Sequence, residues 1–239
     1  KRTAIGEFAA VRPSGLAAII LKTGDELRWS KLTSGTDEVI LVTANGQALR
    51  FKESDVRVMG RNASGVNAIK LAPGDRLVNV DRAEERGELL VASERGFVKR
   101  TVLKEYPTLG RYSKGVSPFA SRSWSQTGHL AAACVVHGED DVAISTARGA
   151  IVYTKAKAFP LQSRSTRGRA IISLRGTDTI VGVARLTAKV RTLPSPSKAA
   201  DMKAATTPRR KPTTTGKRSA RAKKATSRGT SSRRKTGRH

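Results

Sequence analysis

The chain has 239 residues, which is enough for one or two domains. Its 46 Lys and Arg against 19 Asp and Glu give a formal net charge of +27, which indicates a polyanionic partner, either nucleic acid or an anionic membrane surface. The single cysteine, Cys134, excludes an internal disulfide scaffold and fits a reducing compartment. No apolar run approaches the ~20 residues that span a bilayer, and no signal peptide is recognisable.

Three segments of the chain align on a turn glycine and define an internal repeat. Apolar runs over residues 39–46, 89–96 and 142–149 end in Gly46, Gly96 and Gly149, and a more polar run follows each of them, at 47–51, 97–101 and 150–154. An apolar strand, a glycine turn and a second strand predict a β-hairpin, and Asn45-Gly46 is a strong signal for a two-residue turn.

The match continues beyond each hairpin. An apolar anchor comes next, then an arginine and then a glycine, in the sets Val56, Arg61, Gly65; Tyr106, Arg111, Gly115; and Phe159, Arg164, Gly168. Each glycine leads into a short third strand (Ile69 and Leu71, Phe119, Ile172 and Leu174), and a last strand closes each unit at 75–80, 129–136 and 179–186. The chain start fits the same frame, because Arg2 is equivalent to Arg50, Arg100 and Tyr153, and Phe8, Arg12 and Gly15 take the next three positions.

Four short strands in each unit of about 50 residues, with no long helical period, predict an all-β, propeller-like array. We expect about four blades over 1–38, 39–88, 89–141 and 142–186, of which the first lacks its first strand and turn. The chain opens at Lys1 inside an expected strand, so we interpret it as part of a longer protein. First strands are apolar on both faces and should be buried, whereas second strands carry Arg or Lys and should lie nearer solvent.

Residues 187–239 differ from the rest in composition. They hold 17 Lys and Arg against one acid, Asp201, and they have no aromatic residue. Such a segment cannot bury enough apolar surface to offset its ordering entropy, so it is predicted to be a disordered basic tail. Its charge favours diffuse, salt-dependent DNA contact, with a merely solubilising extension as the alternative. The candidate contacts are Arg209, Arg210, Lys211, Lys217, Arg218, Lys223, Lys224, Arg233, Arg234 and Lys235.

Two blades carry a specific resemblance to a known family. The runs over 46–71 and 96–116 resemble blades of the C-terminal domain of the A subunit of bacterial type II topoisomerases, DNA gyrase and topoisomerase IV. The resemblance covers roughly residues 1–186 and implies a β-pinwheel, a propeller-like disc whose blades exchange strands with their neighbours. It also implies that the outer edge of the disc binds duplex DNA largely without sequence specificity and bends or wraps it.

The resemblance further implies an enzyme that changes DNA topology by ATP-dependent double-strand passage, in which this chain is a non-catalytic part. The implied partners are double-stranded DNA and a second A subunit, together with an ATPase B-type subunit. ATP and Mg²⁺ belong to other parts of the assembly, so no cofactor or metal is expected in this chain. The implied location is cytoplasmic, at the nucleoid, with no membrane contact.

Two departures from the family pattern concern activity. The glutamine-, arginine- and glycine-rich box that marks gyrase is not present, and its closest echoes are the segments 111–115 and 164–168. The sequence therefore does not separate gyrase from topoisomerase IV. The cleavage domain with its active-site tyrosine is not in this sequence, and Tyr106, Tyr112 and Tyr153 occupy blade positions instead.

Sequence-neutral DNA binding needs cations spread along the phosphate path, and a repeat places equivalent cations at one radius. Exposed arginines are often merely solvated, and the repeated loop arginine has the alternative of capping backbone carbonyls between blades. The candidate contacts in the blades are Lys1, Arg2, Arg12, Arg50, Arg57, Arg61, Lys99, Arg100, Arg111, Lys114, Arg164, Arg167 and Arg169.

Other functions find less support in the sequence. His129, His137 and His239 lie in no metal-ligand spacing, there is no phosphate-binding loop of the Walker type, and Cys134 lies in an apolar strand. The main alternative is a protein-interaction β-propeller whose basic tail alone contacts nucleic acid. Membrane attachment through the tail lacks an adjacent apolar anchor or a lipidation signal.

Overall fold

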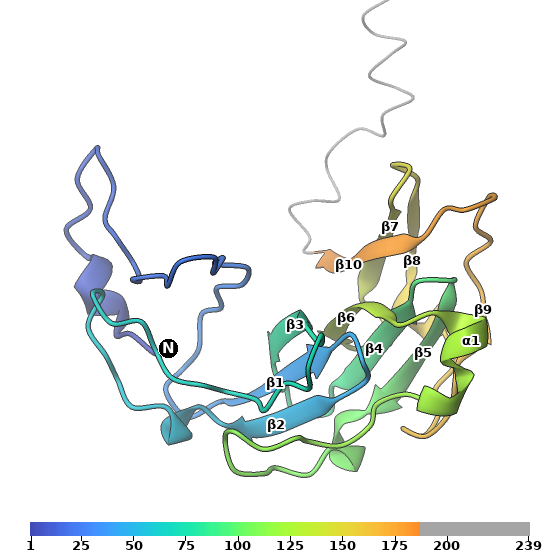
Figure 1. Ribbon diagram of the computed structural model, residues 1–239, viewed down its shortest axis with the longest axis horizontal. Helices are drawn as coiled ribbons and strands as arrows, with labels where there is room; N and C mark the ends of the chain where they lie inside the picture. Colours follow the sequence, from blue (N-terminus) through green and yellow to red (C-terminus); the bar gives the residue numbers. More distant parts are fainter. Residues whose placement is uncertain (187–239) are drawn as a thin grey trace, which may run out of the picture. The chain divides into compact units, whose positions relative to one another are not determined.

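A computed structural model describes residues 1–186, and this part of the chain consists of strands, long irregular segments and little helix (Figure 1). The strands are β1 (Glu38–Thr43), β2 (Ala48–Lys52), β3 (Leu77–Arg82), β4 (Glu88–Ser93), β5 (Phe97–Val102), β6 (Leu130–Val136), β7 (Asp141–Thr146), β8 (Ile151–Lys155), β9 (Arg169–Ala170) and β10 (Ile180–Leu186). The helical pieces are α1 (Trp124–Thr127) and the 3-10 turns η1 (Ile5–Phe8), η2 (Glu53–Asp55), η3 (Leu103–Glu105), η4 (Ser121–Ser123) and η5 (Ala156–Ala158). The basic segment 187–239 and its candidate DNA contacts lie outside the described residues.

The described strands form three antiparallel sheets, one for each of the second, third and fourth repeat units. Their strand orders are β2-β1-β3, β6-β4-β5-β9 and β10-β7-β8. The all-β prediction is therefore confirmed for this part of the chain. No helix within residues 1–186 is long and apolar enough to cross a membrane.

Each hairpin turns in a three-residue loop, so the two-residue prediction at Asn45-Gly46 is wrong in detail. Thr43 N–H donates to the Gln47 carbonyl at 2.9 Å, and Gly46, with φ +74°, is the loop residue in the left-handed region. A two-residue type I′ turn would need a positive φ at Asn45 as well. The Thr43 hydroxyl also accepts the Gln47 N–H at 3.1 Å, and Ser93 and Thr146 repeat this bond in the next two units.

The third strand of a unit pairs with the preceding unit, which confirms the strand exchange that the resemblance implies. Strand β9 of the fourth unit lies at the outer edge of the third unit's sheet, with Val98 opposite Arg169. In the third unit the equivalent pairing is one residue long, where Ala48 and Val116 exchange two backbone hydrogen bonds of 2.8 Å. The prediction of a full third strand is wrong there, because Pro118 follows closely and has no N–H to continue a ladder.

The first unit, residues 1–37, forms no strand. Arg2 makes an isolated bridge with Val58, and the strand expected around Ile19 and Leu21 is not formed. The reason is topological. A third strand pairs with the second strand of the unit before it, and the described residues contain no such unit before the first.

The aromatic anchors of the third and fourth units fill junctions between units. Tyr106 is 1% exposed and packs in one cluster with Ile40 of the second unit and Leu89 of the third. Phe159 is equally buried one junction further on. Trp124 stacks on Phe119 at 5.5 Å at the edge of the first of these clusters.

Cys134 lies in β6 and is buried, as the sequence predicts. Burial raises the pKa of its thiol to about 12, so the thiolate that reacts with electrophiles is scarce near neutral pH. Both observations indicate an inert structural role for this residue.

The units have an inner and an outer side. The last strands of successive units contact one another, β3 with β6 and β6 with β10. Each sheet therefore runs from an inner last strand to an outer second strand, and the exchanged segment of the next unit is added on the outside.

The exchange depends on a glycine at each close approach, which can be tested at Gly115. A Cβ there would meet the Ala48 carbonyl oxygen at 2.2 Å, whereas Gly149, with a similar φ of +83°, has nothing within 4 Å. Both Gly→Ala changes cost about 1–2 kcal/mol of backbone strain. We expect Gly115→Ala to lower the free energy of unfolding by at least about 1 kcal/mol more, because it also breaks the Ala48–Val116 pairing. Urea unfolding of both variants measures this difference, and equal losses would contradict it.

Candidate nucleic-acid interface

The second-strand arginines are structural ties between units. Arg50 Nε donates to Glu38 at 2.6 Å and its Nη1 donates to the Leu103 carbonyl of the next unit at 2.9 Å. Arg100 repeats the arrangement with Glu88 and with the Phe159 carbonyl, at 3.0 Å for the latter. Arg2 instead donates to the Gly35 carbonyl of its own unit at 3.1 Å. The prediction that second strands turn these residues to solvent is wrong for Arg100, which is 7% exposed.

The lysine beside each of two second-strand arginines is held by the loop of the following unit. Lys99 is fully buried, and its Nζ donates to the carbonyls of Ser163 and Arg164 at 2.6 and 2.7 Å and to the Thr166 hydroxyl. Lys1 donates in the same way to the carbonyls at the equivalent loop positions 60, 61 and 63. Solvent exposure predicted for Lys99 is therefore wrong, because the exchanged loop covers it.

Burial lowers the pKa of Lys99 to about 7. The nearby Arg164 charge adds to this lowering, and Glu105 opposes it.

The repeated loop arginines cap carbonyls at the unit junctions, which is one of the two alternatives that the sequence left open. Arg61 donates to the Ala17 carbonyl at 3.2 Å, and Arg164 donates to the Ser117 carbonyl at 3.3 Å. Arg111 donates to the equivalent carbonyl of Asn67 and, through Nε, to that of Asp55. In each case the acceptor lies two residues after the loop glycine of the preceding unit. These side chains are only partly exposed.

The other predicted cations of the blades are exposed. Lys114 and Arg167 occupy equivalent positions, directly before Gly115 and Gly168, on the segments that cover the second strands from outside. Arg169 follows in β9, and its backbone pairs with Val98 while its side chain is exposed. Arg167 also lies over the Phe97 ring at 6.0 Å. These three cations therefore lie at the outer edge; Arg12 and Arg57 are exposed as well, on the first two units.

The sequence reasoning missed other exposed cations. Lys104 and Lys157 lie at equivalent positions in η3 and η5, directly after the second strands. Their equivalence in the repeat was the signal that could have found them. Lys157 is paired with Glu139 at 2.9 Å, whereas Lys52 and Lys104 are exposed on neighbouring units.

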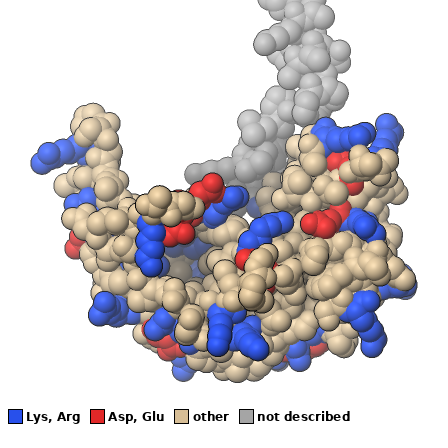
Figure 2. Space-filling model, in the orientation of Figure 1, with Lys and Arg blue, Asp and Glu red and all other residues tan. Residues whose placement is uncertain are grey.

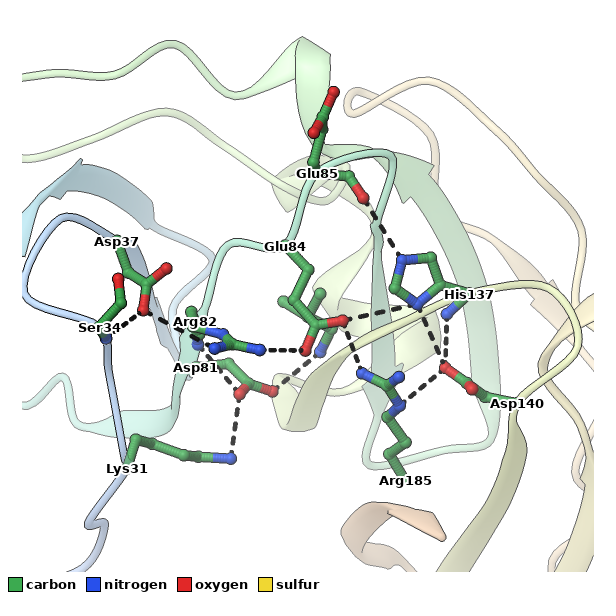
Figure 3. A network of polar contacts seen from close by, with 11 residues as sticks. Lys31, Ser34, Asp37, Asp81, Arg82, Glu84, Glu85, His137, Asp140 and Arg185 are labelled. Carbon is green, nitrogen blue, oxygen red and sulfur yellow. Dashed lines mark hydrogen bonds and ion pairs between the residues drawn. The ribbon is translucent and has the colours of Figure 1, made fainter. Parts of the chain in front are cut away.

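Charges near the inner strands are balanced within a network at the ends of β3, β6 and β10 (Figure 3). Arg185 pairs with Glu84 at 2.9 Å and with Asp140 at 2.8 Å, and Arg82 pairs with Glu84 at 3.3 Å. His137 lies 3.6 Å from the same two acids. Burial raises the pKa of Glu84, but hydrogen bonds and charges from Arg185 and Arg82 outweigh this and leave that pKa lowered.

The distribution of charge thus separates the inner strands from the outer edge. Asp81, near the same network, pairs with Lys31 at 3.0 Å and accepts the Val135 N–H. Figure 2 shows Asp and Glu next to Lys and Arg in the middle of one face, and several Lys and Arg with a few acids among them along its lower edge. Within residues 1–186, the arrangement therefore offers an anionic polymer its best partners at the outer edge.

The geometry defines a class of protein: a propeller-like domain with strand-exchanged blades, balanced charges at its inner strands and exposed cations on its exchange segments. A family model for the DNA gyrase C-terminal domain, beta-propeller, matches residues 37–84, 87–117 and 140–187. These segments cover more than half of the chain, so the chain belongs to the family of DNA gyrase C-terminal domains.

Curated relatives agree with this assignment. The chain is 37% identical over 186 residues to the DNA gyrase A subunit of Pseudomonas aeruginosa, covering 78% of this chain and 20% of that protein. It is 38% identical over 186 residues to the corresponding protein of Escherichia coli K12, covering 78% of this chain and 21% of that protein. The chain thus spans about a fifth of the length of these relatives.

Two solved structures share the fold. The C-terminal domain of DNA topoisomerase IV aligns with a TM-score of 0.73 at 26% identity, covering 86% of this chain and 63% of that one. The DNA gyrase A C-terminal domain aligns with a TM-score of 0.67 at 27% identity, covering 73% of this chain and 59% of that one. The β-pinwheel prediction is confirmed by this likeness and by the strand exchange.

The lowered pKa of Lys99 predicts a dependence of stability on pH. Its pKa is about 7 in the folded chain but about 10.4 in an unfolded one. Between these values the unfolded chain binds more protons, so the free energy of unfolding rises as pH increases from about 7 towards 10. The rise expected from Lys99 is on the order of a few kcal/mol.

Denaturant unfolding at several pH values checks this prediction by comparing variants. Lys99→Met removes the titrating group and should flatten the rise, whereas Lys104→Met, at an exposed position five residues on, should retain it. The same slope in both variants would contradict the assignment.

Proposed function

We propose that this chain binds duplex DNA along the outer edge of its blades, largely without sequence specificity, and bends or wraps it for a type II topoisomerase. The observation that carries the proposal is the recurrence of exposed cations on the exchange segments, at Lys114, Arg167 and Arg169. A row of phosphate contacts gives affinity that does not depend on base sequence.

The proposed contact set is narrower than the full set of candidate cations. Lys99 and Arg100 are buried, and Arg50 is tied to Glu38 and to the next unit, so these three serve the fold. The loop arginines Arg61 and Arg164 donate hydrogen bonds to backbone carbonyls of the preceding unit, so they help to hold the exchange segments in place. Arg12, Arg57 and the cations of the tail remain in the proposed set.

Curvature of the array favours curved DNA in this proposal. The third and fourth units present their exchange segments in the same way, so phosphate contacts at Lys114 and at Arg167 and Arg169 would follow the turn from one unit to the next. Smoothly bending a short site costs on the order of 1–6 kcal/mol, which several phosphate contacts offset.

The wider setting follows from the relatives, which are DNA gyrase A subunits. We place the chain in a protein of that kind, which pairs with a second copy and with an ATPase B-type subunit to change DNA topology. ATP and Mg²⁺ would act in other parts of that assembly, and the chain itself would hold no cofactor. A cytoplasmic location at the nucleoid follows from the DNA partner.

Matched charge removals test the interface. We compare the triple variant Lys114→Ala, Arg167→Ala, Arg169→Ala with a control triple variant, Lys22→Ala, Arg76→Ala, Arg175→Ala. The control residues are also exposed, but they lie beside other turns, outside the stretches next to Gly115 and Gly168. The first set should weaken duplex binding and make the slope of log affinity against log salt shallower by about 2–3. The second set should change both far less. Equal effects would overturn the edge interface and favour contact through the tail alone.

Wrapping is tested separately from binding. We add the full chain to relaxed circular DNA, close the DNA with a nicking-closing enzyme and measure linking number on gels. Chiral wrapping should give a positive shift that grows with protein concentration and that the Lys114, Arg167 and Arg169 triple variant reduces. Retarded DNA with an unchanged linking number would reject wrapping and leave bending or simple binding.

A further inference from the structure

Tyr112 is an exposed aromatic residue in a backbone conformation that residues with a side chain rarely adopt. Its φ is +64°, and within residues 1–186 the only other non-glycine residue with a positive φ is Arg86, at +58°. The left-handed region crowds the Cβ of an L-residue against its own backbone, so a bulky residue there carries strain that another interaction must offset. Glycine would occupy this position freely.

Packing within the described chain does not offset this strain. Tyr112 is 51% exposed, and among residues 1–186 its ring belongs to none of the three buried apolar clusters and to no stacked pair of rings. Its counterparts in the neighbouring units, Asn62 and Ser165, are smaller and polar, and they keep a negative φ. The third unit therefore presents a ring at a position where the fold itself requires none.

The backbone that carries the ring is held firmly against the second unit. Tyr112 N–H donates to the Ala68 carbonyl at 2.7 Å, and the Ser113 carbonyl accepts the Lys70 N–H at 3.1 Å. Arg111, directly before the tyrosine, donates to two further carbonyls of that unit. A side chain on so fixed a backbone loses little freedom when it meets a partner, which favours a binding role for the ring.

The neighbours of Tyr112 in the sequence indicate what that partner is. Lys114 is exposed two residues further on, and the segment 107–116 contains no acid. Two extended residues span at most about 7 Å, which is close to the minor groove's width of about 6 Å. A ring at this position therefore meets a groove of the duplex when Lys114 contacts a phosphate at its border.

We propose that the Tyr112 ring packs against duplex DNA at the outer edge, on the sugars and base edges of the groove beside the phosphate that Lys114 contacts. The inference rests on the proposed DNA-binding function and adds an apolar contact to it. Phosphate contacts release counterions and weaken with salt, whereas burial of an apolar ring releases none. The ring therefore supplies a part of the affinity that salt does not screen.

The salt dependence of DNA affinity separates the ring from the cations. With the full chain and a duplex of mixed sequence, Tyr112→Gly should lower affinity by about five- to thirty-fold at every salt concentration, which is the effect expected from burying half of a tyrosine side chain. The slope of log affinity against log salt should not change. Tyr112→Phe keeps the ring and should match the native chain. Lys114→Ala should instead make the slope shallower by about 1.

The two variants also separate failure of this inference from failure of the proposed function. A shallower slope for Lys114→Ala together with native affinity for Tyr112→Gly would reject DNA as the partner of the ring and favour a protein partner, while the edge interface stands. Native behaviour of both variants would count against the edge interface itself and overturn the ring contact with it.

Thermal unfolding tests whether the ring serves the fold instead. Tyr112→Gly relieves the left-handed strain, so its melting temperature should be no lower than that of the native chain even though its DNA affinity falls. A structural role predicts the opposite, because loss of the ring would then destabilise the loop and its neighbours. A melting temperature that falls together with the affinity would assign the ring to the fold and overturn the proposal.

Photocrosslinking tests the contact directly. We attach a photoactivated aryl azide to the thiol of Tyr112→Cys, since the native Cys134 is buried. The control is Arg86→Cys with the same label, because Arg86 is also exposed and has a positive φ but lies in the turn between β3 and β4. The label at position 112 should crosslink duplex DNA in clear excess over the label at position 86. Equal yields would reject the proposed contact.

Discussion

An exposed second strand must be covered, and this constraint organises the whole described structure. The hairpin of a unit leaves one strand at an edge, with backbone groups that need partners and side chains that need burial. The following unit supplies both through its exchange segment, as Val116 does for Ala48. Because the cover is non-local, a unit is completed only by its neighbour, and the anchors Tyr106 and Phe159 pack between units rather than within one.

The same contact explains why so many cations of this basic chain serve the fold. An arginine on the second strand satisfies carbonyls of the covering segment, and Lys99 does so from a buried position at the expense of its own charge. Cations on the outer face of the covering segment escape this use, as do exposed cations away from the junctions such as Lys52 and Lys104. A carbonyl-capping arginine and an exposed cation therefore lie only three positions apart in one short stretch, as Arg111 and Lys114 do and as Arg164 and Arg167 do, which is why net charge alone does not identify an interface.

Local patterns in the sequence predicted what local interactions determine. The hairpins, the junction aromatics and the buried Cys134 follow from strand periodicity and from the repeat. The burial of Lys99 and Arg100 could not be predicted in the same way, because their alternation with apolar residues is also the pattern of a solvent-facing strand. Their cover comes from residues about sixty positions later. Glu53 is similar: it is buried and accepts bonds from Thr33, Gly35 and Asp37, and no signal in its own segment indicates this. In the candidate site, Lys114, Arg167 and Arg169 were predicted, and Lys104 was missed although the repeat contains its counterpart.

The junctions are of two kinds, and this restricts how such an array can change its length. Lys1 of the first unit and Lys99 of the third are held by the loops of the units that follow them, whereas Leu49 and Val152 occupy the same position in the second and fourth units. Duplicating or deleting a single unit would place a lysine beneath a loop that otherwise covers an apolar residue such as Leu49. It could also place an apolar residue beneath a loop whose three oxygen acceptors otherwise bind a lysine Nζ. A change of two units preserves every junction. Gene duplications within this domain are therefore expected to survive most readily when they add or remove units in pairs.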